Sequence, residues 1–323
     1  IQAKAYWRIE NITIDGDNIL IEPNYGGRTP ASISHDIYII GNEVRNYADF
    51  GGANIGLIKI HGGGGNGTYS AYNIFIWNNI LHDLLSRCTL ARQGISCGMN
   101  EPIGDNPWNV TTDTRFGAIT TMSCEQYVIP GGQAYSGQNC VGTGYIEIVN
   151  NTMYNVPTTF FFKNSAPGPT LIEGNTIYNA QSLGWWNSAN VTMRKNLVYG
   201  ITRQLLSGLI IHNGPTIGGG LRSMDPTLRS LILIPITGQN TVIEYNTFVD
   251  MDKIAQYGTT GTNQIIRYNV MFGLNGRMSG VSYDTPGYIA RGDSSSGGTD
   301  DNANVSLSDL KGGNFNNNCL ISP

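Results

Sequence analysis

The sequence predicts an all-β solenoid of parallel strands, and three observations support this fold class. Seven short β-type runs end in asparagine: IYIIGN at Asn42, IFIWNN at Asn79, IEIVNN at Asn151, TLIEGN at Asn175, VTMRKN at Asn196, TVIEYN at Asn246 and QIIRYN at Asn269. Where the spacing is short, these asparagines recur after 24, 21 and 23 residues, a period typical of stacked repeats. Only 13% of the residues are charged, too few for a helical bundle with a charged outer face.

Each repeat contains a second β-type run that precedes the next asparagine run. These second runs cover residues 57–61, 159–163, 183–186 and 209–212, and a turn rich in Gly, Asn or Ser follows each of them. Short strands with period-2 alternation and Gly/Asn turns fit a parallel coil. An up-and-down barrel would instead show hairpin signals about every 8–12 residues.

Coil geometry explains the asparagine column. Stacked strands place equivalent residues about 4.8 Å apart, so an inward Asn at a bend can bond its own turn and the Asn of the next coil. Asp17 falls at the same position one coil before Asn42. Inward apolar residues are expected to stack as aliphatic ladders, with the pairs Ile37/Ile39, Ile74/Ile76 and Ile146/Ile148 as examples.

The predicted organisation is one solenoid over residues 1–279 and a polar C-terminal tail or cap over 280–323. Two segments interrupt the repeat, at about 84–143 and 213–239. Insertions this long within a compact fold are usually functional or covering elements. In a solenoid they can form the walls of a groove along one face.

With its period, asparagine column and aliphatic stacking, the chain resembles the right-handed parallel β-helix superfamily, the pectate-lyase-like fold, over roughly residues 8–275. The resemblance implies a single-stranded right-handed parallel β-helix with long loop insertions. It does not specify an activity, because the superfamily includes polysaccharide lyases, glycoside hydrolases, epimerases, phage tailspikes and adhesins. The catalytic signatures of its polygalacturonases and pectate lyases are absent from the sequence.

The cysteines favour an oxidising compartment. Four of the five lie in the first insertion, at Cys88, Cys97, Cys124 and Cys140, without a zinc-binding spacing. We expect two disulfides, with Cys88–Cys97 and Cys124–Cys140 favoured among three possible pairings; free buried thiols are the alternative. This predicts an extracellular or cell-surface protein, with Cys319 left over.

Charge and hydropathy exclude two classes of partner. The net charge of −4 gives no general attraction for nucleic acid. The sequence contains no run of 18 apolar residues that would predict a membrane span, and the first residues lack the pattern of a signal peptide. The first strand-like segment shows no cap, so we expect a neighbouring domain or a second copy at that end.

The second runs provide the candidate catalytic residues. If Ile60, Phe162, Trp185 and Ile211 face inward, then His61, Lys163, Trp186 and His212 form one outward column, with Lys59 two residues earlier. A slip of one residue would turn this column inward.

This column suggests a saccharide groove. Lys59, His61, Lys163 and His212 could act as a base or bind carboxylates, as β-elimination of uronic acids requires. Trp186 could stack on a sugar, and Arg87, Arg92 and Arg115 of the insertion could bind substrate. No residue of this column supplies the proton donor. The competing interpretation is an ordinary solvated strand face.

Acidic residues suggest two weaker sites. Asp15 and Asp17 lie in a short Asp-Gly-Asp-Asn segment that could bind Ca²⁺, an ion that lyases of the resembled superfamily often use, although turn chemistry explains the same residues. Loop carboxylates could serve a glycoside hydrolase, whose two carboxylates must lie about 5–9.5 Å apart.

The functional expectation is therefore a protein that binds or cleaves an acidic polysaccharide along one face, as a lyase or glycoside hydrolase if it is an enzyme. The alternative is a non-catalytic structural or adhesive surface protein, such as a tailspike body or fibre component.

Overall fold

A computed structural model describes most of the predicted repeats. The described residues are 5–21, 34–47, 55–61, 71–84, 116–122, 144–165, 169–188, 190–200, 209–211, 242–249, 255–257, 265–272, 289–291, 314–316 and 319–321. Over these residues the structure is all-β, with no helix. It therefore contains no helix there that is long and apolar enough to cross a membrane.

One sheet contains nine parallel strands, one from each repeat. In order they are β1 (Ala5–Glu10), β4 (Ser34–Ile40), β7 (Ala71–Trp77), β10 (Ile146–Val149), β12 (Thr170–Glu173), β14 (Val191–Arg194), β17 (Val242–Glu244), β20 (Ile265–Arg267) and β23 (Asn314–Asn316). Each neighbour in this order comes from the next repeat of the chain, as a solenoid requires.

A second sheet of fifteen strands divides into two parallel arms. The first arm contains β2 (Thr13–Asp15), β5 (Glu43–Arg45), β8 (Ile80–His82), β11 (Thr152–Ser165), β13 (Thr176–Ser188), β15 (Leu197–Tyr199), β18 (Thr247–Val249), β21 (Val270–Phe272) and β24 (Cys319–Ile321). The other arm contains β3 (Ile19–Ile21), β6 (Ile55–His61), β9 (Phe116–Met122), the C-terminal halves of β11 and β13, β16 (Leu209–Ile211), β19 (Ala255–Tyr257) and β22 (Ile289–Arg291). The long strands β11 and β13 belong to both arms.

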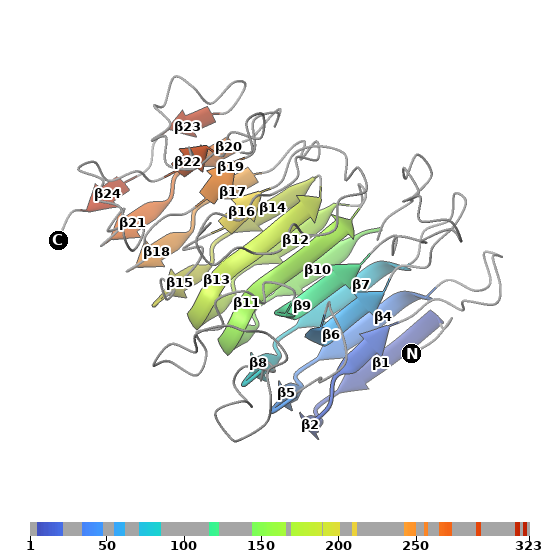
Figure 1. Ribbon diagram of the computed structural model, residues 1–323. Coiled ribbons are helices and arrows are strands. Elements are labelled where there is room, and N and C mark those ends of the chain that lie inside the picture. The colour runs from blue at the N-terminus through green and yellow to red at the C-terminus, as the bar shows by residue number, and fades with distance from the viewer. Residues whose placement is uncertain are drawn as a thin grey trace, which may run out of the picture.

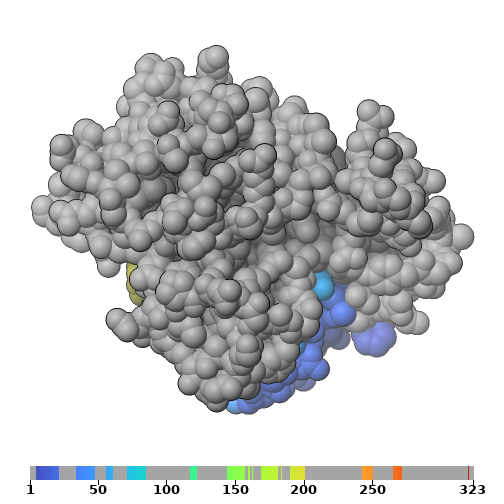
Figure 2. Space-filling model, viewed as in Figure 1, coloured from blue at the N-terminus to red at the C-terminus, as the bar shows by residue number. Residues whose placement is uncertain are grey.

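The strands stack in chain order, so β1 and β24 lie at opposite ends of the stack (Figure 1). Described residues of the N-terminal repeats, drawn in blue, reach the molecular surface along the lower edge of Figure 2. The architecture fits a β-solenoid. Strand β9 lies within the segment 84–143, and β22, β23 and β24 lie within 280–323, so both segments contribute strands to the sheets.

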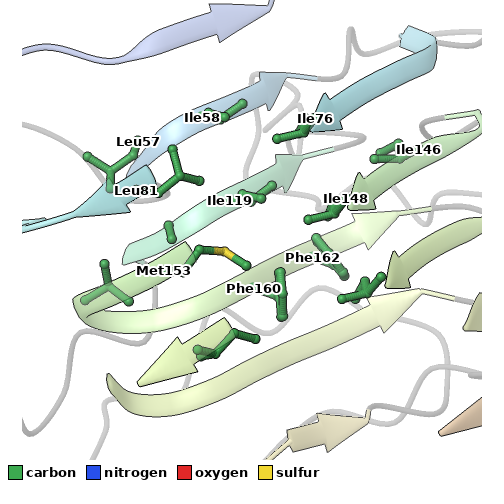
Figure 3. Close-up of a cluster of buried hydrophobic side chains, with 14 of the residues drawn as sticks. Leu57, Ile58, Ile76, Leu81, Ile119, Ile146, Ile148, Met153, Phe160 and Phe162 are labelled. Atoms are coloured by element: carbon green, nitrogen blue, oxygen red, sulfur yellow. The ribbon is translucent and has the colours of Figure 1, made fainter. Parts of the chain in front are cut away.

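The core consists of aliphatic rows between the sheets, as predicted. In the nine-stranded sheet Ile39 pairs with Ile76 and Ile76 with Ile148, and all three side chains are fully buried. On the opposite wall Ile58 pairs with Ile119 and Ile119 with Phe160, which are fully buried as well (Figure 3). Isoleucine suits these rows because its branched side chain packs well on a pleated surface and gains about 1.5–3 kcal/mol on burial.

The seven predicted asparagines form one continuous buried ladder at the turn between the two sheets. From Asn42 to Asn269, each side-chain amide donates to the Oδ1 of the next asparagine at 2.9–3.1 Å. Each backbone N–H donates to that same Oδ1 at 2.8–3.0 Å. Every side chain is at most 2% exposed, so the ladder satisfies polar groups that water cannot reach.

The residue at the first position of the ladder differs from the predicted one. Ile12, not Asp17, occupies the first position, because its backbone N–H donates to Oδ1 of Asn42 at 3.2 Å. Asp17 lies after β2, where its Oδ1 accepts the N–H of Asn18. Counting back one repeat length failed because loop lengths differ between repeats, whereas strand pairing fixes the position.

Candidate functional site

The predicted column of basic residues lies on the arm that contains β6, β9 and β11. His61 and Lys163 both pair with Met122 of β9, so they share one row but are separated by a strand. Lys59 is half-buried and pairs with Thr120 of the same strand. The side chains of His61 and Lys163 lie outside the described part of the structure.

The alignment at the tryptophans differs by one residue from the expected one. Phe162 pairs with Trp186, and Trp186 with Ile211. Trp186 thus shares the row of the buried Ile60 and Phe162, and Trp185 shares the row of Lys59. Two adjacent tryptophans have no period-2 signal, so the sequence could not decide which one faces inward.

Both faces of strand β9 are covered. The consecutive side chains Ile119, Thr120 and Thr121 are at most 1% exposed. The row that begins at Lys59 is therefore not open to solvent at its next strand. The remaining predicted residues lie outside the described residues: Arg87, Arg92, Arg115, His212, Cys88, Cys97, Cys124 and Cys140.

The two acidic residues considered for calcium make protein contacts. Asp15 accepts hydrogen bonds from Arg45 at 3.1 Å and from the side chain of Asn46 at 2.9 Å. The bond from Asn46 lowers the pKa of Asp15, and Arg45 lowers it further. Among the described residues, no group of three or more His, Cys, Asp or Glu could hold a metal ion.

A cluster of aromatic side chains covers the outer face of the nine-stranded sheet near its N-terminal end. We call it the outer aromatic patch; it comprises Tyr38, Phe75, Trp77, Tyr145 and the carboxylate of Glu147. Tyr38 stacks on Phe75 with ring centroids 4.6 Å apart, and Trp77 lies 5.2 Å from Phe75. All five side chains are half-buried. They point outward because Ile37, Ile39 and Ile74, which alternate with them, fill the core.

Glu147 lies beside these rings and is held by two of them. Its Oε2 accepts the indole N–H of Trp77 at 3.1 Å, and its Oε1 accepts the hydroxyl of Tyr145. Burial, followed by the hydrogen bond to Glu147, raises the pKa of Tyr145 to about 12. The patch therefore combines apolar ring surface with a fixed carboxylate and a protonated phenol.

A His-Asp pair occurs twice in the structure with the same local geometry. In each copy the aspartate has a positive φ, and its Oδ2 lies 2.7 Å from Nδ1 of the preceding histidine. The other oxygen of the aspartate accepts the amide of an asparagine one repeat later, at 2.8–2.9 Å. The copies are His35-Asp36 with Asn73, and His82-Asp83 with Asn155.

At His82 the second ring nitrogen is also occupied. Its Nε2 lies 3.0 Å from Oε1 of Glu43, which also accepts from Arg45 at 2.9 Å. Both ring nitrogens of His82 therefore lie within hydrogen-bond distance of a carboxylate. The bond from His82 lowers the pKa of Glu43. This copy is buried and stacked on Tyr154, which makes it a structural ion network.

Among the described residues, no group occupies the second ring nitrogen of His35. Within the described part of the chain, Nε2 has no hydrogen-bond partner, and the side chain is 21% exposed. The ring stacks on Tyr72 at 4.8 Å and meets the ring of Tyr6 edge-on at 5.4 Å. The hydrogen bond from His35 lowers the pKa of Asp36, so the aspartate stays ionised and orients the ring.

The outer face of the nine-stranded sheet is balanced in charge. Arg8 pairs with Glu10, Arg194 and Lys195 pair with Glu173, and Arg267 pairs with Glu244. The basic partner of each pair is exposed, so each pair contributes at most about 1 kcal/mol. Binding on this face must therefore depend on stacking and local hydrogen bonds more than on long-range attraction.

Comparison with known proteins gives no relative: no protein-family model, no curated protein and no solved structure matches this chain. The candidate site therefore depends on geometry alone. It comprises the outer aromatic patch and the neighbouring His35-Asp36 pair, all on strands β1, β4, β7 and β10 or directly before them.

Two patterns in the sequence, outside the column of basic residues, indicate this site. The dipeptide His-Asp occurs twice, each time next to a β-type run. The alternation in Ile37–Ile40 and Ile74–Trp77 also places Tyr38, Phe75 and Trp77 outward once the isoleucines are assigned to the core.

Proposed function

We propose that this chain is a polysaccharide-binding β-solenoid, and that the outer aromatic patch is its binding surface. The observation that supports it is the cluster of half-buried aromatic rings beside Glu147 on the outer side of the nine-stranded sheet. Aromatic rings stack on the apolar faces of sugars, while a fixed carboxylate accepts hydrogen bonds from sugar hydroxyls. The protein is then extracellular or attached to the cell surface.

We infer that the solenoid is a right-handed parallel β-helix of the pectate-lyase-like type. Parallel strands joined by crossovers are right-handed in about 98% of cases. The buried asparagine ladder and the aliphatic rows support the same class. A long solenoid face suits an extended polymer, because the same side-chain row recurs at each strand spacing of about 4.8 Å.

We propose an acidic polysaccharide as the ligand class. One feature supports carboxylate binding: the side chain of Arg8 is 59% exposed and lies in the row of Tyr38. An arginine that faces solvent can exchange its partner Glu10 for a sugar carboxylate, because exposed ion pairs are weak.

Affinity electrophoresis tests this function. The protein is run through native gels that contain alginate, pectate, a glycosaminoglycan or a neutral glucan. We expect an acidic polysaccharide to retard the wild type and Trp77→Ala to abolish most of this retardation. Tyr199→Ala is the matched control, because Tyr199 is an exposed aromatic residue on the fifteen-stranded sheet, away from the patch. The proposal fails if no polysaccharide retards the wild type, or if both variants bind equally weakly.

The alternative role as a fibre or adhesive component has its own test. A trimeric or polymeric mass in solution, together with no retardation by any polysaccharide, would favour that role. A monomer retarded by one acidic polysaccharide would favour binding.

A further inference from the structure

We propose that His35 is the general base of a lyase that cleaves the bound polysaccharide by β-elimination, with Tyr72 as the proton donor. This inference rests on the proposed function, because the substrate must lie on the outer aromatic patch. It assigns the proton donor that the basic residues of the predicted column did not supply.

The contrast between the two His-Asp pairs carries the inference. At His82 both ring nitrogens face carboxylates, so no nitrogen is available to a ligand. At His35 the aspartate occupies only Nδ1 and leaves Nε2 without a partner in the described structure. An aspartate on one nitrogen fixes the tautomer that leaves the other nitrogen as an acceptor, which is how enzymes prepare a histidine base.

The pair lies beside the binding surface. His35 and Tyr38 belong to strand β4, and Tyr72 and Phe75 belong to the adjacent strand β7. Asp36 lies between His35 and Tyr38 with a positive φ, so β4 bends there and places the pair within three residues of the patch. His35 pairs with Tyr72 in the strand register, and their rings are almost parallel.

The surroundings suit an acid and a base acting together. Burial, and then the charge of Asp36, raise the pKa of Tyr72, so its phenol keeps its proton. Asp36 carries the negative charge that stabilises His35 once it is protonated. Arg8 is an exposed cation on β1 in the row of Tyr38, where it can bind a carboxylate of the polymer.

The reaction needs no co-reactant. Nε2 of His35 takes the proton from C5 of a uronate residue, the C4–C5 double bond forms, and the bond between C4 and O4 breaks with its electron pair on O4. The hydroxyl of Tyr72 gives its proton to O4, and the proton on His35 returns to the phenolate through solvent. The products are a saturated chain and one with an unsaturated uronate end.

Absorbance of these unsaturated ends provides the assay. The folded protein is incubated with alginate, pectate and a glycosaminoglycan, and we expect one of them to yield unsaturated ends. His35→Gln should lower kcat by about 100-fold or more, the usual contribution of a positioned base. Its retardation in the affinity gel should not change, because the outer aromatic patch is intact.

Two further variants separate catalysis from structure. His82→Gln alters the equivalent motif without touching the proposed base, so its folded fraction should keep wild-type kcat. Asp36 is a positioning residue, and Asp36→Asn should lower kcat while KM stays close to the wild-type value. The inference is overturned if the folded wild type produces no unsaturated ends, or if His35→Gln and His82→Gln lower kcat equally. Retardation without cleavage would overturn the lyase and leave the binding function intact.

Discussion

Replacement of Asn175 by alanine tests the energetic role of the buried ladder. Its Oδ1 accepts the backbone N–H of Asn151 at 2.8 Å and the side-chain amide of Asn151 at 3.1 Å. Its own amide donates to the carbonyl of Ile148 and to Oδ1 of Asn196, both at 2.9 Å. The side chain is 1% exposed, so water cannot replace these bonds. An orphaned buried N–H costs about 2 kcal/mol and each other lost bond about 1 kcal/mol. Asn175→Ala orphans one N–H and loses three other bonds, so we expect it to lower the free energy of unfolding by about 5 kcal/mol.

Asn42→Ala is the matched control at the end of the ladder. Oδ1 of Asn42 accepts only the backbone N–H of Ile12, a residue that is 47% exposed, so water can take over this bond. Its two donated bonds, to Ile9 and Asn79, are lost as in the first variant. The expected loss is about 2 kcal/mol.

Urea unfolding followed by circular dichroism measures both values. The internal position should therefore cost more than twice as much as the terminal one. Equal losses, or a loss below about 1 kcal/mol at Asn175, would refute the claim that the ladder protects buried donors from going unpaired.

Three further predictions concern single positions. The pKa of Tyr145 is raised from 10.0 to about 12, so its contribution to stability is complete below pH 10 and is lost as the pH rises toward 12. Glu147→Gln should lower this pKa in an ultraviolet titration of the tyrosine, because it removes the charge of Glu147. An unchanged pKa would contradict the contact between Tyr145 and Glu147. Gly174→Ala should destabilise the fold by about 1–3 kcal/mol, because the φ of Gly174 is positive and a Cβ would lie 2.3 Å from the side-chain oxygen of Asn150. Gly16→Ala is the control, because its Cβ would meet no atom within 4 Å, and thermal melts of both variants should show the smaller loss at Gly16. Tyr245 has a φ of 56° and an exposed ring, so Tyr245→Asn should change stability by less than about 1 kcal/mol, because relief of backbone strain offsets the lost ring stacking; a larger loss would show that the stacking dominates.

Much of the architecture could be predicted because stacking repeats one local rule. All seven predicted asparagines lie in the ladder, and the pairs Ile37/Ile39, Ile74/Ile76 and Ile146/Ile148 are fully buried. Both signals are local, since an inward Asn at a bend and alternating isoleucines are visible within one run. The same locality explains the error at Asp17, because only strand pairing shows that Ile12 holds the first position.

Non-local relations were harder to predict. Strand β9 lies in a segment without an asparagine run, so nothing in Phe116–Met122 showed that it would separate β6 from β11. As a result His61 and Lys163 are farther apart than adjacent strands would place them. The roles of Lys59, His61 and Lys163 remain predictions.

The proposed site at His35 could not be predicted from the sequence, for a different physical reason. Whether a ring nitrogen is open depends on a partner from another repeat, and Glu43 reaches His82 across 39 residues. Both His-Asp dipeptides look the same in the sequence. Only the pairing of strands β5 and β8 shows that one is closed.

Ile12 gives the asparagine column a direction that matters for assembly. From Asn79 onward, every asparagine of the column receives a backbone N–H and an amide from the repeat before it, but Ile12 has no side-chain oxygen with which to receive them. Another repeat of the same kind stacked on β1 would therefore leave two donors unpaired against an isoleucine. End-to-end growth of copies by continuation of the column is disfavoured at this end, whereas an element with an apolar side chain at that height would be accommodated. Ile12 thus makes this end of the stack selective, because the unpaired backbone of the edge strand could bond any added strand but its side chain cannot accept an asparagine amide.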